Sequence, residues 1–204
     1  MTVQSYNMSF TAGGLFLRES IELAELFLLV GDWTTVRSKA LDHNLIQSRT
    51  KSSAIRICRE ICKRLEGLSK AELKILAKGS MQEQQQILWL AICRRHSFIR
   101  EFAVEVIREK YLQLDLDLRP EDYDAFFNAK AEWHDVLEQI TESTRKKLRQ
   151  VIFRMLRETG LLTKHNVINP AMLTLQVAQA VGSQTPDDLR IFPLSDTNIR
   201  ELLK

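Results

Sequence analysis

Apolar side chains recur at spacings of three and four through most of the chain, which is the period of an amphipathic helix. In the N-terminal half this pattern predicts three helices, over residues 15–30, 32–43 and 50–66. Gly31 stops the first helix, and Asp32 is placed to cap the second. Gly67 follows the third helix, where we expect the left-handed conformation that often ends a helix.

Two capping boxes predict the starts of two further helices. Ser69 begins the sequence SKAE and Ser80 begins SMQE, and in such boxes each of the two side chains satisfies a backbone N–H of the other residue. Gly79 ends the first of these two helices. Another helix is predicted over residues 97–111.

Beyond this helix the period changes. Leu112, Leu114, Leu116 and Leu118 alternate with polar residues, which predicts a strand. The remaining elements are predicted as a long helix opened by a proline, a helix ended by a glycine, a small hairpin and two C-terminal helices, over residues 120–139, 143–160, 161–168, 170–181 and 195 onward.

The order of these elements predicts the fold class. Helix, strand, helix, helix and hairpin follow one another as in a winged helix-turn-helix, and the helices before residue 68, joined by the short connection NLIQS, suit a helix-turn-helix. We therefore expect a mainly α protein with three parts. These are a helix-turn-helix-like N-terminal domain over 1–68, connecting helices over 69–96, and a winged helix-turn-helix-like C-terminal domain with a small β element over 97–204.

Composition narrows the class of protein. The net charge of +3 over 204 residues excludes a uniformly basic protein, so any nucleic-acid signal depends on where the charges cluster. Cys58, Cys62 and Cys93 are too few for a disulfide framework and odd in number, which favours a reducing cytoplasm. Charged residues interrupt the most hydrophobic segment, residues 15–30, so we expect neither a membrane span nor a targeting segment.

The segment STRKKLRQVIFRMLRETGLL, which starts at Ser143, contains six Lys or Arg residues before its first acid. At 100° per residue its apolar arc holds Leu148, Val151, Ile152, Met155 and Leu156. Its opposite arc holds Lys146, Lys147, Gln150, Arg154 and Arg157. The DNA major groove admits such a helix, and Arg, Lys and Gln reach phosphates and base acceptors there. We predict DNA contacts from this arc, from Thr144 and Arg145 before it, and from Lys164 and His165 on the hairpin.

A second basic helix is predicted in SRTKSSAIRICREICKRLEG, which starts at Ser48. Its expected buried stripe is Ala54, Ile57, Cys58, Ile61 and Leu65. The reverse side carries Ser52, Arg56, Arg59 and Lys63. Arg49 and Lys51 lie at the N-terminal end, where the helix dipole and free N–H groups favour phosphate. These six residues are the second predicted set of DNA contacts.

The two segments together hold twelve of the 29 basic residues but only Glu60, Glu66 and Glu158 among the 26 acids. Such segregation suits a polyanion-binding surface, because cationic groups gain by releasing counterions from phosphates. A solvated helix face remains the alternative for either segment alone, since surface Lys and Arg are common. Shifted by 91 residues, Ser52 and Ser53 fall on Ser143 and Thr144, an echo that helical periodicity alone can produce.

The sequence contains other candidate sites, but the evidence for a function is weaker at each of them. Cys58, Cys62, Cys93 and His96 have loose spacing for a zinc site, and the two cysteines of the predicted helix lie on or beside its apolar stripe, so buried structural cysteines are favoured. His134 lies among the acids Glu132, Asp135 and Glu138, which favours a solvated face over acid–base chemistry. Trp33, Trp89 and Trp133 are expected in packing rather than as base-stacking platforms. No convergent catalytic set or phosphate loop appears, so we expect no enzyme, cofactor or small-molecule substrate.

Three blocks of the sequence resemble a known family. NLIQSRTKSSAIRICREICKRLEGLS, ILWLAICRRHSFIREFAVEVIREKYL and the segment from Ser143 are similar to the BrxA proteins of BREX bacteriophage-exclusion systems, over about residues 9–193. The resemblance implies a small, helical, non-enzymatic cytoplasmic protein that binds double-stranded DNA and serves phage defence. It transfers no binding residues, so the residue assignments above depend on the sequence alone.

The leading hypothesis is therefore double-stranded DNA binding through two basic helices and a wing. An adaptor or scaffold, whose basic faces dock acidic surfaces on other BREX proteins, is the second hypothesis. RNA binding by a helical bundle is the third, and duplex competition separates it from the first because A-form RNA has a major groove too narrow for a helix.

Overall fold

The computed structural model describes residues 6–10, 13–183 and 185–204, and it confirms a mainly α protein. The chain forms two compact units. The inserted unit is Leu15–Arg95, and the C-terminal unit combines His96–Lys204 with the stretch that precedes the inserted unit. The inserted unit therefore includes the helices over 69–96, whereas a separate functional domain ending at residue 68 stays a prediction. No helix within the described ranges is both long enough and apolar enough to cross a bilayer.

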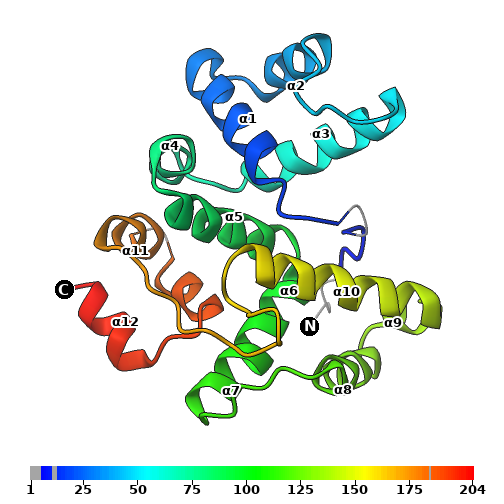
Figure 1. Ribbon diagram of the computed structural model, residues 1–204, viewed down its shortest axis with the longest axis vertical. Helices are drawn as coiled ribbons and strands as arrows, with labels where there is room; N and C mark the ends of the chain where they lie inside the picture. The colour runs from blue at the N-terminus through cyan, green and yellow to red at the C-terminus, as the bar shows by residue number, and fades with distance from the viewer. Residues whose placement is uncertain (1–5, 11–12, 184) are drawn as a thin grey trace. The chain divides into compact units, whose positions relative to one another are not determined.

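Five helices build the inserted unit, and α1 contacts each of the other four (Figure 1). Their bounds are α1 Leu17–Val30, α2 Trp33–Asp42, α3 Lys51–Leu65, α4 Lys70–Lys78 and α5 Met81–Arg95. The core holds Leu23, Ile61 and Trp89, all with no exposed surface. These long apolar side chains recur on one face of each helix, so their burial stabilises the bundle.

The predicted start signals of these helices are confirmed. The Asp32 carboxylate accepts the N–H of Thr35 at 2.7 Å. Ser69 and Ser80 each exchange hydrogen bonds with the glutamate three residues later, with Ser80 N–H to Glu83 Oε2 at 2.8 Å. Gly31 ends α1 at a φ of 73°, in the left-handed region.

The left-handed stop expected at Gly67 was wrong. Gly67 is not among the glycines with positive φ, and its N–H donates to Arg64 O at 3.3 Å while the N–H of Leu68 donates to Leu65 O at 3.0 Å. The helix thus ends in tight turns that need no left-handed residue, and Leu68 is buried.

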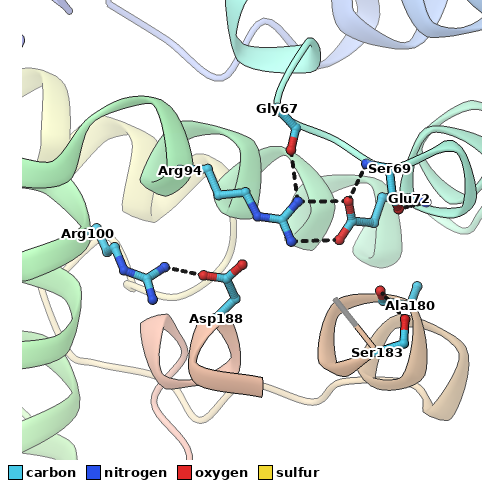
Figure 2. A network of polar contacts seen from close by, with 8 residues as sticks. All are labelled: Gly67, Ser69, Glu72, Arg94, Arg100, Ala180, Ser183 and Asp188. Atoms are coloured by element: carbon cyan, nitrogen blue, oxygen red, sulfur yellow. Dashed lines mark hydrogen bonds and ion pairs between the residues drawn. The ribbon is translucent and has the colours of Figure 1, made fainter. Parts of the chain in front are cut away.

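A buried ion pair joins α4 to α5 within the inserted unit. The Arg94 guanidinium donates to both Glu72 carboxylate oxygens, at 2.8 and 2.9 Å, and to Gly67 O at 3.0 Å (Figure 2). The same carboxylate accepts the Ser69 N–H at 2.6 Å. Glu72 has no exposed surface, so each of these donors offsets part of the cost of burying its charge.

After the inserted unit, the chain continues in the C-terminal unit with three helical segments that follow one another without a gap. These are α6 Ser97–Phe102, the π-helical segment η1 Ala103–Arg108 and α7 Glu109–Leu112. The later elements are α8 Pro120–Ala131, α9 Asp135–Glu138, α10 Glu142–Glu158, α11 Leu175–Gly182, the 3-10 segment η2 Pro186–Ile191 and α12 Asp196–Leu202. Two arginines of these helical segments bind the C-terminal part of the chain. Arg100 forms an ion pair with Asp188 (Figure 2), and Arg108 donates a hydrogen bond to Leu194 O at 3.0 Å.

Aromatic rings make the core of this unit. Phe98 lies with its ring centroid 5.1 Å from that of Phe126 and 6.1 Å from that of Tyr123. The N-terminal stretch joins the same core, because Tyr6 meets Phe98 edge-on at 5.4 Å and Phe10 has no exposed surface. Residues 6–10 therefore pack as part of the C-terminal unit although unit-forming helices separate them in sequence.

The helix predicted over 120–139 is broken, and that prediction was wrong in its length. Residues 132 and 133 form a turn, and His134 after them is extended, with φ of −137° and ψ of 95°. Its ring lies 4.0 Å from the ring of Tyr6, a contact with a segment more than a hundred residues earlier. The helix expected from residue 170 likewise starts only at Leu175, where Thr174 caps it by accepting the Val177 N–H.

The strand predicted from the alternating leucines was wrong, because the described chain has only an isolated β-bridge there, at Asp117. α7 runs to Leu112, and Leu114 is 82% exposed with a positive φ of 60°, so the chain turns there instead of extending. Antiparallel bridges then join Asp117 to Val167 and Leu162 to Ile168. The β element of the described chain is therefore a pairing of three short segments. Two of them are the arms of the expected hairpin, and the third is the segment around Asp117.

Candidate nucleic-acid interface

Helix α10 is fixed by a cap and by a buried stripe. Thr141 accepts the N–H of Thr144 at 3.3 Å, and Gly160 takes a φ of 74° just beyond the helix end. The predicted apolar arc is confirmed, because all five members are at most 3% exposed: Leu148, Val151, Ile152, Met155 and Leu156. The opposite arc of this helix therefore faces away from the core of the unit.

That opposite arc is exposed and polar. Its members are Lys146, Lys147, Gln150, Arg154 and Arg157. Lys146 pairs with Glu142 at 2.6 Å and Arg154 pairs with Glu158 at 2.7 Å, both one helical turn apart, yet the two cationic side chains remain 59% and 64% exposed. Exposed pairs of this kind contribute little to stability, so either cation can exchange its carboxylate for a stronger anion.

Arg145 lies elsewhere, on the side of α10 that faces α8. Its Nε donates to the Asp124 carboxylate at 3.1 Å, its Nη2 to the Asp124 backbone oxygen at 2.8 Å, and its Nη1 to Asn128 at 2.7 Å. The guanidinium carbon lies 4.6 Å from the centroid of the Phe127 ring. The expected DNA contact is therefore engaged within the protein. Thr144 is half-buried at the same end.

Arg149, which the sequence analysis did not single out, pairs with the same Asp124 carboxylate. Arg145 and Arg149 are four residues apart, so they share one face of the helix, and this spacing was the available signal. Neither arginine lies on the exposed arc.

The hairpin places Lys164 and His165 beyond the end of α10. Both residues are exposed in a turn closed by Thr163, whose N–H donates to Val167 O at 2.9 Å. Asn169 Nδ2 donates to Gly160 O at 2.9 Å, and Arg157 donates to Asn166 at 3.3 Å, so the hairpin is tied to the C-terminal end of the helix. Figure 1 shows this short connection running from the end of α10.

Helix α3 of the inserted unit has a similar construction. Thr50 accepts the N–H of Ser53 at 3.2 Å, and its hydroxyl lies 2.9 Å from the Ser53 hydroxyl. At α10 the hydroxyls of Thr141 and Thr144 are also 2.9 Å apart. The two caps are 91 residues apart, so the sequence echo extends to the local geometry of both helix starts.

The buried stripe of α3 differs slightly from the prediction. Ala54, Cys58, Ile61 and Leu65 are buried as expected, but Ile57 is only half-buried and Cys62 is buried in its place. The six predicted contacts are all exposed: Arg49, Lys51, Ser52, Arg56, Arg59 and Lys63. In the described part of the chain the five cations among them have no ion pair. Arg64, by contrast, is 1% exposed and pairs with Glu60 at 2.9 Å.

The other candidate residues fall mostly within packing. Cys58, Cys62 and Cys93 are all buried, as expected. A hydrogen bond between the first two lowers the pKa of Cys58 and, together with burial, raises that of Cys62. Within the described ranges, His, Cys, Asp and Glu side chains form no group of three or more with the geometry of a metal site.

The tryptophans divide between core and surface. Trp89 has no exposed surface and Trp33 stacks on Phe27 with ring centroids 4.2 Å apart, which confirms packing roles for both. Trp133 is 73% exposed, so the packing role expected for it was wrong. Trp133 lies in the turn between α8 and α9, outside both helices.

The fold and these two surfaces define a class of small helical protein in which two separate units each present a capped amphipathic helix with a cationic outer face. The chain belongs to the BrxA family, whose model matches residues 4–185. It is 30% identical over 148 residues to the BREX protein BrxA of Escherichia coli O9:H4 (strain HS), covering 72% of this chain and 70% of that protein.

A second relative carries the same family name, and a solved structure has the same fold. The BREX protein BrxA of Bacillus cereus (strain H3081.97) is 28% identical over 127 residues, which span 62% of this chain and 64% of that protein. The fold matches the crystal structure of an uncharacterized protein from Magnetospirillum magneticum with a TM-score of 0.81 and 21% identity, over 94% of this chain and 100% of that one.

Proposed function

We propose that this protein is a non-enzymatic component of a BREX phage-defence system that binds double-stranded DNA through the outer faces of α3 and α10. Membership of the BrxA family supports the place in a BREX system. The observation that carries the DNA proposal is the separation of α10 into a fully buried apolar arc and an exposed arc of Lys146, Lys147, Gln150, Arg154 and Arg157.

In this proposal each exposed residue has a role that follows from its chemistry. Lys and Arg neutralise phosphates, while Gln150 and Arg154 near the middle of the arc reach base edges in the major groove. Lys164 and His165, which lie on the hairpin, contact the sugar–phosphate backbone of the DNA, as the wing of a winged helix-turn-helix does. Arg145 positions α10 on α8 instead of contacting DNA, because its guanidinium is already satisfied.

The inserted unit contributes a second contact of the same kind. Arg56, Arg59 and Lys63 lie along one side of α3, with Arg49 and Lys51 at its N-terminal end. Since these cations have no ion pair among the described residues, phosphate binding would break no ion pair there.

Competition between duplexes tests the proposal against RNA binding. Labelled duplex DNA bound to the protein is challenged with unlabelled DNA and RNA duplexes of the same sequence and length. DNA is expected to compete better, because an A-form major groove does not admit a helix. Equal or stronger competition by RNA would contradict the assignment of DNA as the ligand.

A further inference from the structure

The exposed indole of Trp133 lies in the turn between α8 and α9, in the C-terminal unit. It is 73% exposed, whereas Trp89 is completely buried and Trp33 is stacked on another ring. Indole rings bury large areas when covered, and Trp is among the residues that most often dominate binding energy at protein interfaces. An exposed Trp at a fixed position is therefore a candidate anchor for a partner.

The turn that carries this indole is held on both sides. The Trp133 N–H donates to Lys130 O at 3.2 Å and the Leu137 N–H donates to His134 O at 2.8 Å. His134 stacks on Tyr6, and Leu137 is 1% exposed. Tyr6 is itself held by its hydroxyl, which donates to Glu101 at 2.6 Å. The backbone that carries the indole is thus held in place by hydrogen bonds and packing, which lowers the entropy cost of binding.

The acidic residues that lie next to Trp133 in the sequence are exposed and unneutralised. Glu132, Asp135 and Glu138 are exposed, and within the described chain none of them has an ion pair. Two other carboxylates of the unit are neutralised, because Asp124 pairs with two arginines and Glu142 with Lys146. The nearby Lys130 is engaged by Glu101 and Glu105. Phosphate would be repelled here, so this surface does not suit DNA.

A cationic side chain is the complement of this surface. An Arg or Lys placed over an indole gains a cation–π interaction, and Trp is the best ring for it. The flanking carboxylates would pair with neighbouring cations, with Arg favoured where it binds a carboxylate with two hydrogen bonds. Glu132 lies beside the indole in sequence, and Asp135 and Glu138 share one side of α9.

We propose that Trp133, Glu132, Asp135 and Glu138 form a docking surface for an arginine- or lysine-rich segment of a partner protein. The surface is chemically opposite to the exposed arc of α10. It does not depend on DNA binding, so the two proposals can fail separately.

Fluorescence anisotropy with the full chain tests this proposal. The probes are a labelled Arg-Gly-Ser repeat peptide, a Lys-Gly-Ser repeat and a Glu-Gly-Ser repeat at physiological salt. The two cationic peptides are expected to bind and the acidic peptide not to bind. Trp133→Ala, and separately the triple change Glu132→Gln, Asp135→Asn and Glu138→Gln, should each weaken cationic peptide binding about tenfold or more.

Matched controls separate this surface from general stickiness. Leu114→Ala removes another exposed apolar side chain of the same unit, 82% exposed, and Glu121→Gln removes another exposed carboxylate. Both should leave peptide binding unchanged, and Trp133→Ala should leave the melting temperature and DNA affinity unchanged. Failure of the cationic peptides to bind, or equal binding by Trp133→Ala, would overturn the proposal. Self-association of the wild type that Trp133→Ala abolishes would assign the surface to a second copy and overturn the partner assignment.

Discussion

The Asp124 carboxylate of α8 accepts the Nε–H of Arg145 from α10 at 3.1 Å. Arg149 pairs with the same carboxylate, and Arg145 also stacks on Phe127. One acid therefore joins the candidate recognition helix to its supporting helix and engages two cations of α10, of which only Arg145 was a predicted DNA contact. The basic character of the sequence segment overstates the number of charges that α10 presents to a ligand.

Replacing this acid separates positioning from charge. Asp124→Asn makes the protein more positive, which by charge alone should tighten DNA binding. We expect weaker binding and a melting temperature lower by about 2–6 °C, because two charge-assisted pairs that hold α10 are lost. Glu142→Gln is the matched control, since it removes one exposed acid 78% open to solvent. That control should bind DNA at least as tightly as the wild type, measured by anisotropy. Tighter binding by Asp124→Asn would sink the positioning role.

Much of the local structure could be predicted from the sequence because its signals are short-range. Asp32, Ser69 and Ser80 cap helices by bonding residues three positions later, so a few neighbouring letters specify each start. The buried arc of α10 follows from helical period alone. The broken helix at 132–134 could not be predicted, since the contact of His134 with Tyr6 depends on the tertiary fold.

Only part of the candidate site could be predicted from the sequence. Exposure of Lys147 and Arg154 follows from their place opposite the apolar arc. The engagement of Arg145 does not, because only the packing of α10 on α8 brings Asp124 within reach. The failure of the strand at Leu114 has a local cause: alternating leucines fit a strand, but the chain has to turn after α7.

The exposed arc of α10 should be removable without unfolding the protein. Lys146→Ala, Lys147→Ala and Arg154→Ala together are expected to weaken DNA binding by ten- to a hundredfold at moderate salt, because about two to three phosphate contacts are lost. The melting temperature should change little, since the ion pairs that these side chains make with other described residues are exposed.

A charge-matched control uses three exposed lysines that belong to neither basic face: Lys74, Lys78 and Lys204. Their replacement by Ala lowers the net charge equally and should reduce affinity only slightly. If both triple variants lose affinity to the same extent, net charge rather than the α10 face explains the binding.

The buried pair of Arg94 and Glu72 should matter far more for folding than surface pairs do. Removing one partner, as in Arg94→Ala, leaves the other buried and uncompensated, so we expect a loss of about 3–5 kcal/mol in the free energy of unfolding. Urea denaturation measures it. Glu22→Ala, which breaks an exposed pair with Arg18, is the control and should cost less than about 1 kcal/mol. Similar losses in the two variants would show that the pair is not effectively buried.

Alkaline pH should destabilise the protein through its buried tyrosines. Burial raises the pKa of Tyr6, and the hydrogen bond to Glu101 raises it further; burial also raises the pKa of Tyr123. The folded state thus keeps protons that the unfolded state loses near pH 10. The stabilising contribution is present below that pH and is lost as pH rises above it. Urea midpoints should therefore fall above pH 10, and Tyr6→Phe should flatten that fall. An unchanged slope in this variant would contradict the role assigned to Tyr6.

The salt dependence of duplex DNA binding tests the central claim most directly. For the wild type we expect log Kd to rise linearly with log salt concentration, with a slope near 0.9 for each phosphate neutralised. Combined replacement of Lys146, Lys147 and Arg154 should reduce that slope by about two to three, and replacement of Arg56, Arg59 and Lys63 should reduce it by a similar amount. Absence of binding even at low salt, or a slope unchanged in both variants, would contradict DNA binding through α3 and α10.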